Sequence, residues 1–163
     1  MNVNDAISRG DLDTLKDLIE QGVDVTAEAL FLAVHNKQCD VVKYLLENGA
    51  YITSPDWGAL FLAASDDETD ILTIIIESGN VDVKAKDDVL IWAAIFGHLD
   101  TVEYFIKHGA QNFDDALIHA KSENRTDVIE YLKNVLIIRR FIKTIRRRIK
   151  HTRTYNFVSC TTH

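Results

Sequence analysis

The stretch Asp88-Val-Leu-Ile-Trp-Ala93-Ala-Ile-Phe-Gly97-His-Leu-Asp100-Thr-Val-Glu-Tyr-Phe-Ile-Lys-His-Gly109-Ala is one copy of a unit that recurs along this chain of 163 residues. In it, an aspartate follows an alanine by seven residues, and a glycine follows the aspartate by nine. The aspartate recurs at Asp13, Asp40, Asp70, Asp100 and Asp127, in steps of 27, 30, 30 and 27 residues. A period of this length is the signature of a repeat architecture, so the sequence predicts a stack of similar units.

Each unit has the pattern of two helices joined by a turn. Apolar residues recur at i, i+3 and i+4 after each aspartate, as in Val102, Phe105 and Ile106, which indicates one buried helix face. The glycine suits the left-handed position that ends a helix, and the aspartate suits a cap or a first-turn charge. The segment before each alanine is short and rich in small residues, which allows helices to approach closely. We therefore predict an all-α array of about five helix-turn-helix repeats.

These columns resemble ankyrin repeats, whose signature includes T-P-L-H-x-A, A-x-x-G-H and a second helix ending L-L-x-x-G-A. Gly97 and His98 match the second element, and Leu45-Leu-Glu-Asn-Gly-Ala50 matches the third. The resemblance covers about residues 5–134 and implies a helical solenoid whose concave face binds proteins. No copy has Thr-Pro, and the repeats are shorter than the usual ankyrin length, so shortened hairpin loops are expected. Such short repeats are similar to those of ankyrin proteins from giant amoebal viruses.

The array is predicted to span residues 1–134. Its repeats are expected at about 4–26, 27–54, 55–84, 85–112 and 113–134. Residues 135–150 have the pattern of a basic amphipathic helix that either caps or extends the array, and residues 151–163 are predicted to form a polar, frayed tail.

Catalytic and metal chemistry have no support in the sequence. The chain lacks the Cys and His spacings of zinc sites, a glycine-rich phosphate loop and a G-x-S-x-G motif, so no metal, no cofactor and no enzyme activity are predicted. The longest apolar run, 89–96, is shorter than a membrane span, and the two cysteines suit a reducing compartment. We expect a soluble intracellular protein, in the host cytoplasm if it is viral, with the nucleus as an alternative.

The resemblance implies that the two residues after each Ala-Ala position project toward the concave face, where a partner protein binds. The candidate partner-binding residues are His35, Asn36, Ser65, Asp66, Trp92, Ile95, Phe96, Ser122 and Glu123. Ile95 and Phe96 interrupt a polar ladder, which is the pattern of a binding hot spot. Packing of Phe96 on the adjacent repeat is an equal alternative, and packing is favoured for Trp92. Tyr51 and Trp57 are candidate extensions of this surface.

The formal net charge of −7 conceals two opposite parts. All acidic residues lie within the first 132 residues, whose net charge is −16, whereas residues 133–163 carry +9 and no acid. An acidic array favours a protein partner with a basic surface and repels nucleic acid. Solubility and helix-start stabilisation are the alternative explanation, favoured for Asp88 and Asp115, which we expect directly before first helices.

The basic tail continues the fifth second helix, because Leu136 stands where the other repeats have their glycine. Apolar residues gather on one side of this helix, and candidate anion-binding residues gather on the other: Arg139, Arg140, Lys143, Arg146, Arg147 and Lys150. Three roles compete, namely a cap on the array, an element for membrane, nucleic acid or nuclear import, and self-association with the acidic array.

We therefore predict a non-catalytic, monomeric protein-protein interaction module that binds its partner on the concave face of the array. The alternative is an adaptor whose basic helix contacts nucleic acid or an anionic membrane while the repeats recruit protein.

Overall fold

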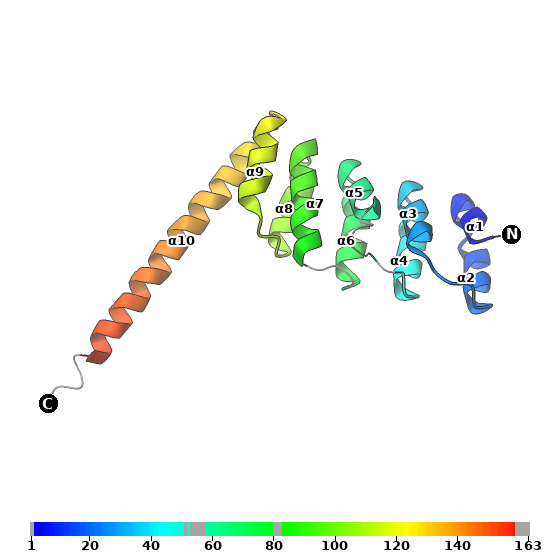
Figure 1. The fold of residues 1–163 in the computed structure, drawn as a ribbon, viewed down its shortest axis with the longest axis horizontal. Helices are drawn as coiled ribbons and strands as arrows, with labels where there is room; N and C mark the ends of the chain where they lie inside the picture. Colours follow the sequence, from blue (N-terminus) through cyan, green and yellow to red (C-terminus); the bar gives the residue numbers. More distant parts are fainter. Residues whose placement is uncertain (1, 51, 53–57, 80–82, 159–163) are drawn as a thin grey trace.

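The computed structural model describes residues 2–50, 52, 58–79 and 83–158 (Figure 1). In this part of the chain there are ten helices and no strand. They are α1 (Val3–Arg9), α2 (Leu12–Glu20), α3 (Ala27–His35), α4 (Cys39–Glu47), α5 (Gly58–Ser65), α6 (Thr69–Glu77), α7 (Val83–Phe96), α8 (Leu99–Lys107), α9 (Phe113–Ser122) and α10 (Thr126–Val158). Successive helices form five pairs that stack into an elongated array, which confirms the predicted helical solenoid.

The two helices of each pair bury side chains of different size. The repeated alanines of the first helices, such as Ala63 and Ala93, are fully buried, while the second helices bury large residues such as Leu72 and Phe105. Small residues let the first helices approach closely, so they contact one another along the whole array. Among the second helices, α4 and α6 make a similar contact, but α2 with α4 and α6 with α8 do not. The first helices therefore pack together more continuously than the second helices, and we name their exposed side the concave face, as the resemblance to ankyrin repeats implies.

The repeated glycines end the second helices as predicted. Gly22, Gly49, Gly79 and Gly109 have φ values of 88°, 94°, 76° and 99°, in the left-handed region. After Gly49, the Ala50 amide donates to the Leu45 carbonyl at 2.9 Å, which satisfies a carbonyl of the last turn. The repeated aspartates are the second residues of their helices, so of the two predicted roles they have that of first-turn charges.

The N-cap of α2 is Asp11, two residues before the repeated Asp13. Its carboxylate accepts hydrogen bonds from the Thr14 hydroxyl at 2.7 Å and from the Thr14 amide at 3.0 Å. These two bonds favour the ionised form and hold the pKa of Asp11 below its usual value.

A second left-handed column lies in the turn between the paired helices. It consists of Gly10, Lys37, Asp67, Gly97 and Asn124, with φ between 56° and 88°. A left-handed conformation costs a residue with a side chain about 1–2 kcal/mol, less for Asn and Asp. All five positions adopt this conformation despite the cost, so the geometry of the tight turn requires it in every repeat. The sequence analysis indicated this turn through Gly97, and Gly10 is the other glycine of the column, whereas Lys37, Asp67 and Asn124 give no such signal.

The residue after this column reaches back to the preceding repeat. Glu68 forms an ion pair with Lys37 at 2.5 Å, and the Arg125 Nε donates to the Ile95 carbonyl at 2.8 Å. The His98 Nε2 lies 2.9 Å from the Ser65 carbonyl, which can only accept, so this nitrogen is the donor. These contacts link the turns of neighbouring repeats and fix how far one repeat is rotated against the next.

The helix α7 begins earlier than predicted and extends toward α9. Since it starts at Val83, Asp88 lies inside the helix and not directly before it. Asp115 also lies inside its helix, in the first turn of α9. The Asp87 carboxylate accepts hydrogen bonds from the backbone amides of Gln111 and Asn112, the latter at 3.1 Å. This contact ties the added length of α7 to the start of the fifth repeat.

The helix α10 belongs to the array only at its start. Val128 and Leu132 are buried, but every side chain from residue 137 to residue 149 is exposed. The helix continues past residue 150, where the sequence predicted a frayed tail, and ends at Val158. Figure 1 shows this part extending away from the array as a single straight helix, and we name residues 137–158 the α10 extension. Its apolar side chains are exposed, and two of them, Ile138 and Ile142, line a hollow with Ile106 and Phe113 at the end of the array.

Candidate functional site

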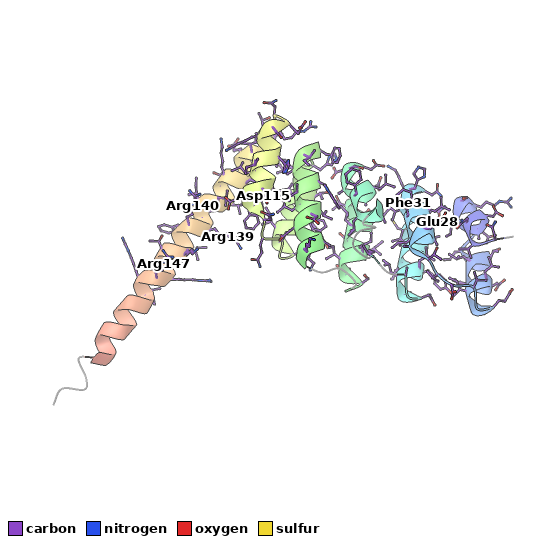
Figure 2. All side chains as sticks on the ribbon, in the orientation of Figure 1. Glu28, Phe31, Asp115, Arg139, Arg140 and Arg147 are labelled. Carbon is purple, nitrogen blue, oxygen red and sulfur yellow. The ribbon has the colours of Figure 1, made fainter. Side chains whose placement is uncertain are left out.

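The concave face carries exposed apolar side chains in one column of the first helices, two residues before the repeated alanine. Phe31 is 41% exposed, Phe61 44% and Ile118 61%, and Ile91 in the same column is half-buried. Figure 2 shows Phe31 projecting from α3 beside Glu28. Most large apolar side chains of a folded domain are buried, so a row of exposed ones indicates a binding surface. The sequence prediction did not include this column, although a large apolar residue directly after each buried leucine is a readable signal.

Aromatic rings join this column to two predicted partner-binding residues. The Phe61 ring contacts Trp92 edge-on, with centroids 5.3 Å apart, and Phe96 at 6.0 Å. Phe96 also stacks against the His98 ring at 6.1 Å. Trp92 and Phe96 are half-buried, as is Ile95. Phe96 thus packs partly on the adjacent repeat, and Phe61 is the more exposed ring of the cluster.

The polar residues predicted for this surface differ in exposure. His35 is exposed and stacks on Phe31 with centroids 6.5 Å apart, whereas Asn36 is half-buried. Asp66, Ser122 and Glu123 are exposed. Ser65 is half-buried and its hydroxyl donates to the Leu62 carbonyl at 2.9 Å. The structure therefore brings His35 next to the apolar column and leaves the carboxylates of Asp66 and Glu123 at the turns. Tyr51 and Trp57 lie outside the described residues.

A shallow pocket opens between α3 and α5. It has a volume of about 250 Å³ and is lined by Ala27, Glu28, Phe31, Gly58 and Ala59. Gly58 helps to form it, since a Cβ at this position would lie 3.3 Å from the Phe31 ring. The lining combines the Phe31 ring and small residues with the exposed Glu28, so the pocket fits a small side chain with a cation next to it.

The predicted anion-binding residues lie on α10, at the other end of the array from Phe31 (Figure 2). Arg139, Arg140, Lys143, Arg146 and Arg147 are exposed, and the side chain of Lys150 lies outside the described residues. The guanidinium of Arg139 sits 4.3 Å from the centre of the Phe113 ring, so a cation–π contact holds this side chain against α9. The two predicted groups of residues thus form two separate surfaces.

Two further findings concern the described residues alone. They contain no group of three His, Cys, Asp or Glu side chains placed to hold a metal ion. None of their helices is long and apolar enough to pass through a membrane.

Comparison with known proteins agrees with the repeat geometry. The family model of ankyrin repeats in three copies matches residues 3–87 and 60–138. The crystal structure of the human ASB11 ankyrin repeat domain superposes with a TM-score of 0.64 at 24% sequence identity, over 83% of this chain and 69% of that one. No curated protein matches the sequence at a significant level. At this identity the structural likeness concerns the fold, whereas the family match extends over most of the array. The chain therefore belongs to the ankyrin-repeat family.

Proposed function

We propose that the chain is a non-catalytic protein-protein interaction module that binds its partner on the concave face of the first helices. Ankyrin repeats typically bind proteins and are generally non-catalytic, so the family supports the class of function. The observation that supports the location is the exposed apolar column of Phe31, Phe61 and Ile118. Exposed aromatic side chains on a rigid scaffold lose little conformational freedom on binding, which favours affinity.

The partner that this surface fits has apolar anchors flanked by cations. The pocket beside Phe31 accepts one small side chain, and the Phe61 ring provides a second flat contact. Exposed carboxylates lie at Glu28, which lines this pocket, and at Asp66 in the turn after α5, and the first 132 residues have a net charge of −16. A basic partner is therefore attracted faster at low ionic strength than at high ionic strength.

The experiment compares three forms of the full chain in affinity capture with crosslinking from cell extract. Phe31→Ala with Phe61→Ala removes two anchors of the column, while Val23→Ala removes an apolar side chain that is 40% exposed in the α2–α3 connector. The partner is expected to bind wild type and Val23→Ala and to be lost from the double variant. Thermal denaturation checks that the double variant remains folded, with a small loss of stability from the ring contacts of Phe61. Equal capture by all three forms contradicts the proposal.

Two finer features of the proposal are tested separately. An intracellular location, in the cytoplasm or the nucleus, is proposed from the two cysteines, a number that suits a reducing compartment, and imaging of the tagged chain checks it. A monomer is expected, which light scattering on the purified chain measures. A viral source has its support in the length of the repeats, and the proposed binding does not depend on it.

A further inference from the structure

The α10 extension is an exposed helix with an apolar side and a basic side. Six large apolar side chains are between 39% and 66% exposed: Ile137, Ile138, Phe141, Ile142, Ile145 and Ile149. At about 100° per residue they occupy an arc of about 140°, and the five described cations that the sequence singles out occupy about 120° on the other side. Arg148 falls near the edge of the apolar arc, from which a long side chain can reach toward a polar layer. Exposure of this much apolar surface on one helix indicates a binding function.

The centre of the apolar side points away from the array, while Ile138 and Ile142 at one edge of it line a hollow with Ile106 and Phe113 at the end of the array. Val128 and Leu132 mark the side of α10 that packs against α8 and α9, and it lies about 130° around the helix from the centre of the apolar arc. The side that continues from Val128 and Leu132 becomes basic, beginning with Arg139 over the Phe113 ring. A flat surface can therefore reach Phe141, Ile145 and Ile149, which do not line this hollow.

We propose that the α10 extension binds flat on the surface of an anionic phospholipid bilayer. In this arrangement Phe141 and Ile145 enter the boundary between headgroups and acyl chains, and the cations contact the lipid phosphates and carboxylates. The charge complementarity is strong, because residues 133–163 carry +9 and no acid. The acidic array remains on the side of the helix away from the lipid.

Other occupants use less of this surface. Nucleic acid binds the cations but leaves the six apolar side chains in water. The extension of a second copy covers the apolar side but leaves the cations of both helices without an anionic partner, since neither helix has an acidic residue in this region. A bilayer with anionic headgroups accommodates the apolar side at the acyl boundary and the cations among the headgroups.

The test is flotation of the full chain with vesicles of phosphatidylcholine containing about 30 mol% phosphatidylserine, beside vesicles of phosphatidylcholine alone. Flotation is expected with the anionic vesicles and not with the neutral ones. Raising the salt concentration to about 0.5 M is expected to weaken it, because the attraction of the cations is screened.

Three double variants separate the contributions. Arg146→Glu with Arg147→Glu is expected to lower the partition coefficient at least about thirty-fold, since each cation near the surface contributes about fivefold. Phe141→Asp with Ile145→Asp is expected to abolish flotation. The matched control, Lys43→Glu with Lys121→Glu, makes the same change of charge at exposed positions of the array and is expected to leave most of the binding.

A second measurement does not depend on the loss of binding. In Phe141→Trp, the added fluorescence relative to wild type is expected to shift to shorter wavelength with anionic vesicles, since the indole enters an apolar layer. Equal flotation with both kinds of vesicle, or none with either, overturns the proposal. So does an unchanged affinity of the aspartate variant together with tight binding of wild type to duplex DNA, which indicates nucleic acid instead. Capture on the concave face is a separate readout, so failure here leaves the proposed function as it stands.

Discussion

Replacing Thr101 with valine tests the polar link between the third and fourth repeats. Thr101 is the buried polar residue of the described core, with no exposed surface. Its hydroxyl donates to the Asp67 carboxylate at 2.8 Å and lies 3.2 Å from the Thr69 hydroxyl, both in the preceding repeat. Valine keeps the shape and removes the donor, so the substitution measures the hydrogen bond without opening a cavity.

The expected destabilisation for Thr101→Val is about 1 kcal/mol. A hydrogen bond to a charged group contributes about 1.5–3 kcal/mol net. The lower end applies, because the Asp67 side chain is 42% exposed and water can replace the hydroxyl. Burying a methyl group in place of the hydroxyl returns part of the loss, at about 0.8 kcal/mol per carbon. Thr101→Ala also loses the methyl contacts and is expected to cost about 2 kcal/mol.

Urea denaturation followed by circular dichroism measures the effect, and for a chain of this size the melting temperature is expected to fall by about 2–4 °C. Thr144→Val is the control, since Thr144 is exposed and its hydroxyl donates to the Arg140 carbonyl within α10 at 3.0 Å. That change is expected to stay within about 0.5 kcal/mol. In the background of Asp67→Asn, which keeps an acceptor without charge, Thr101→Val is expected to cost less.

A Thr101→Val variant refutes the reasoning if it is as stable as wild type and its free energy of unfolding falls with urea concentration at the same slope. Such a result means that the hydroxyl and the Asp67 carboxylate lose as much hydration on burial as their hydrogen bond returns.

Three further predictions concern single positions. Gly97→Ala is expected to cost about 2 kcal/mol, because φ is +88° and the new Cβ lies 2.9 Å from the held Arg125 Cδ. Gly22→Ala, with the same φ and no atom within 4 Å, is expected to cost about half as much in urea denaturation, and equal costs exclude the clash. Burial raises the pKa of the Cys39 thiol, so in Cys160→Ser its alkylation at neutral pH is expected to be slower than that of free cysteine; equal rates contradict this. Asp11→Ala is expected to lower the melting temperature at neutral pH, an effect that disappears as the pH falls below the ordinary pKa of 3.8 and through the lowered folded value; a pH-independent difference refutes it.

Recurring residues let the sequence predict the local structure of each repeat. The constant spacing of alanine, aspartate and glycine identified two helices of fixed length, and Gly109 was correctly expected in a left-handed conformation. These features follow from sequence because a helix end and a buried face depend on nearby residues. The turn column was recognisable at Gly97 and hidden at Lys37, where the neighbouring helices impose a conformation that lysine does not prefer.

Surface residues were harder to predict, because their exposure depends on the next repeat. The pattern within one helix could not distinguish whether Phe96 faces a partner or a neighbour, and the structure packs it edge-on against Phe61. The same ring contact leaves Phe61 on the concave face, which the sequence prediction overlooked. The rotation between neighbouring repeats determines how the Phe61 and Phe96 rings cover each other. Residues distant in sequence set that rotation.

The C-terminal helix shows the same division. From the sequence alone, the missing glycine at Leu136 determined that the helix continues, and the spacing of cations and isoleucines determined its two sides. The tertiary structure decided how these sides are oriented, because burial of Val128 and Leu132 against the array fixes the rotation of the whole helix about its axis. Ile138 and Ile142 thereby border the end of the array, while the centre of the apolar side points away from it. A sequence specifies the angle between two faces of one helix, but only packing against other helices determines which face meets the protein and which meets its surroundings.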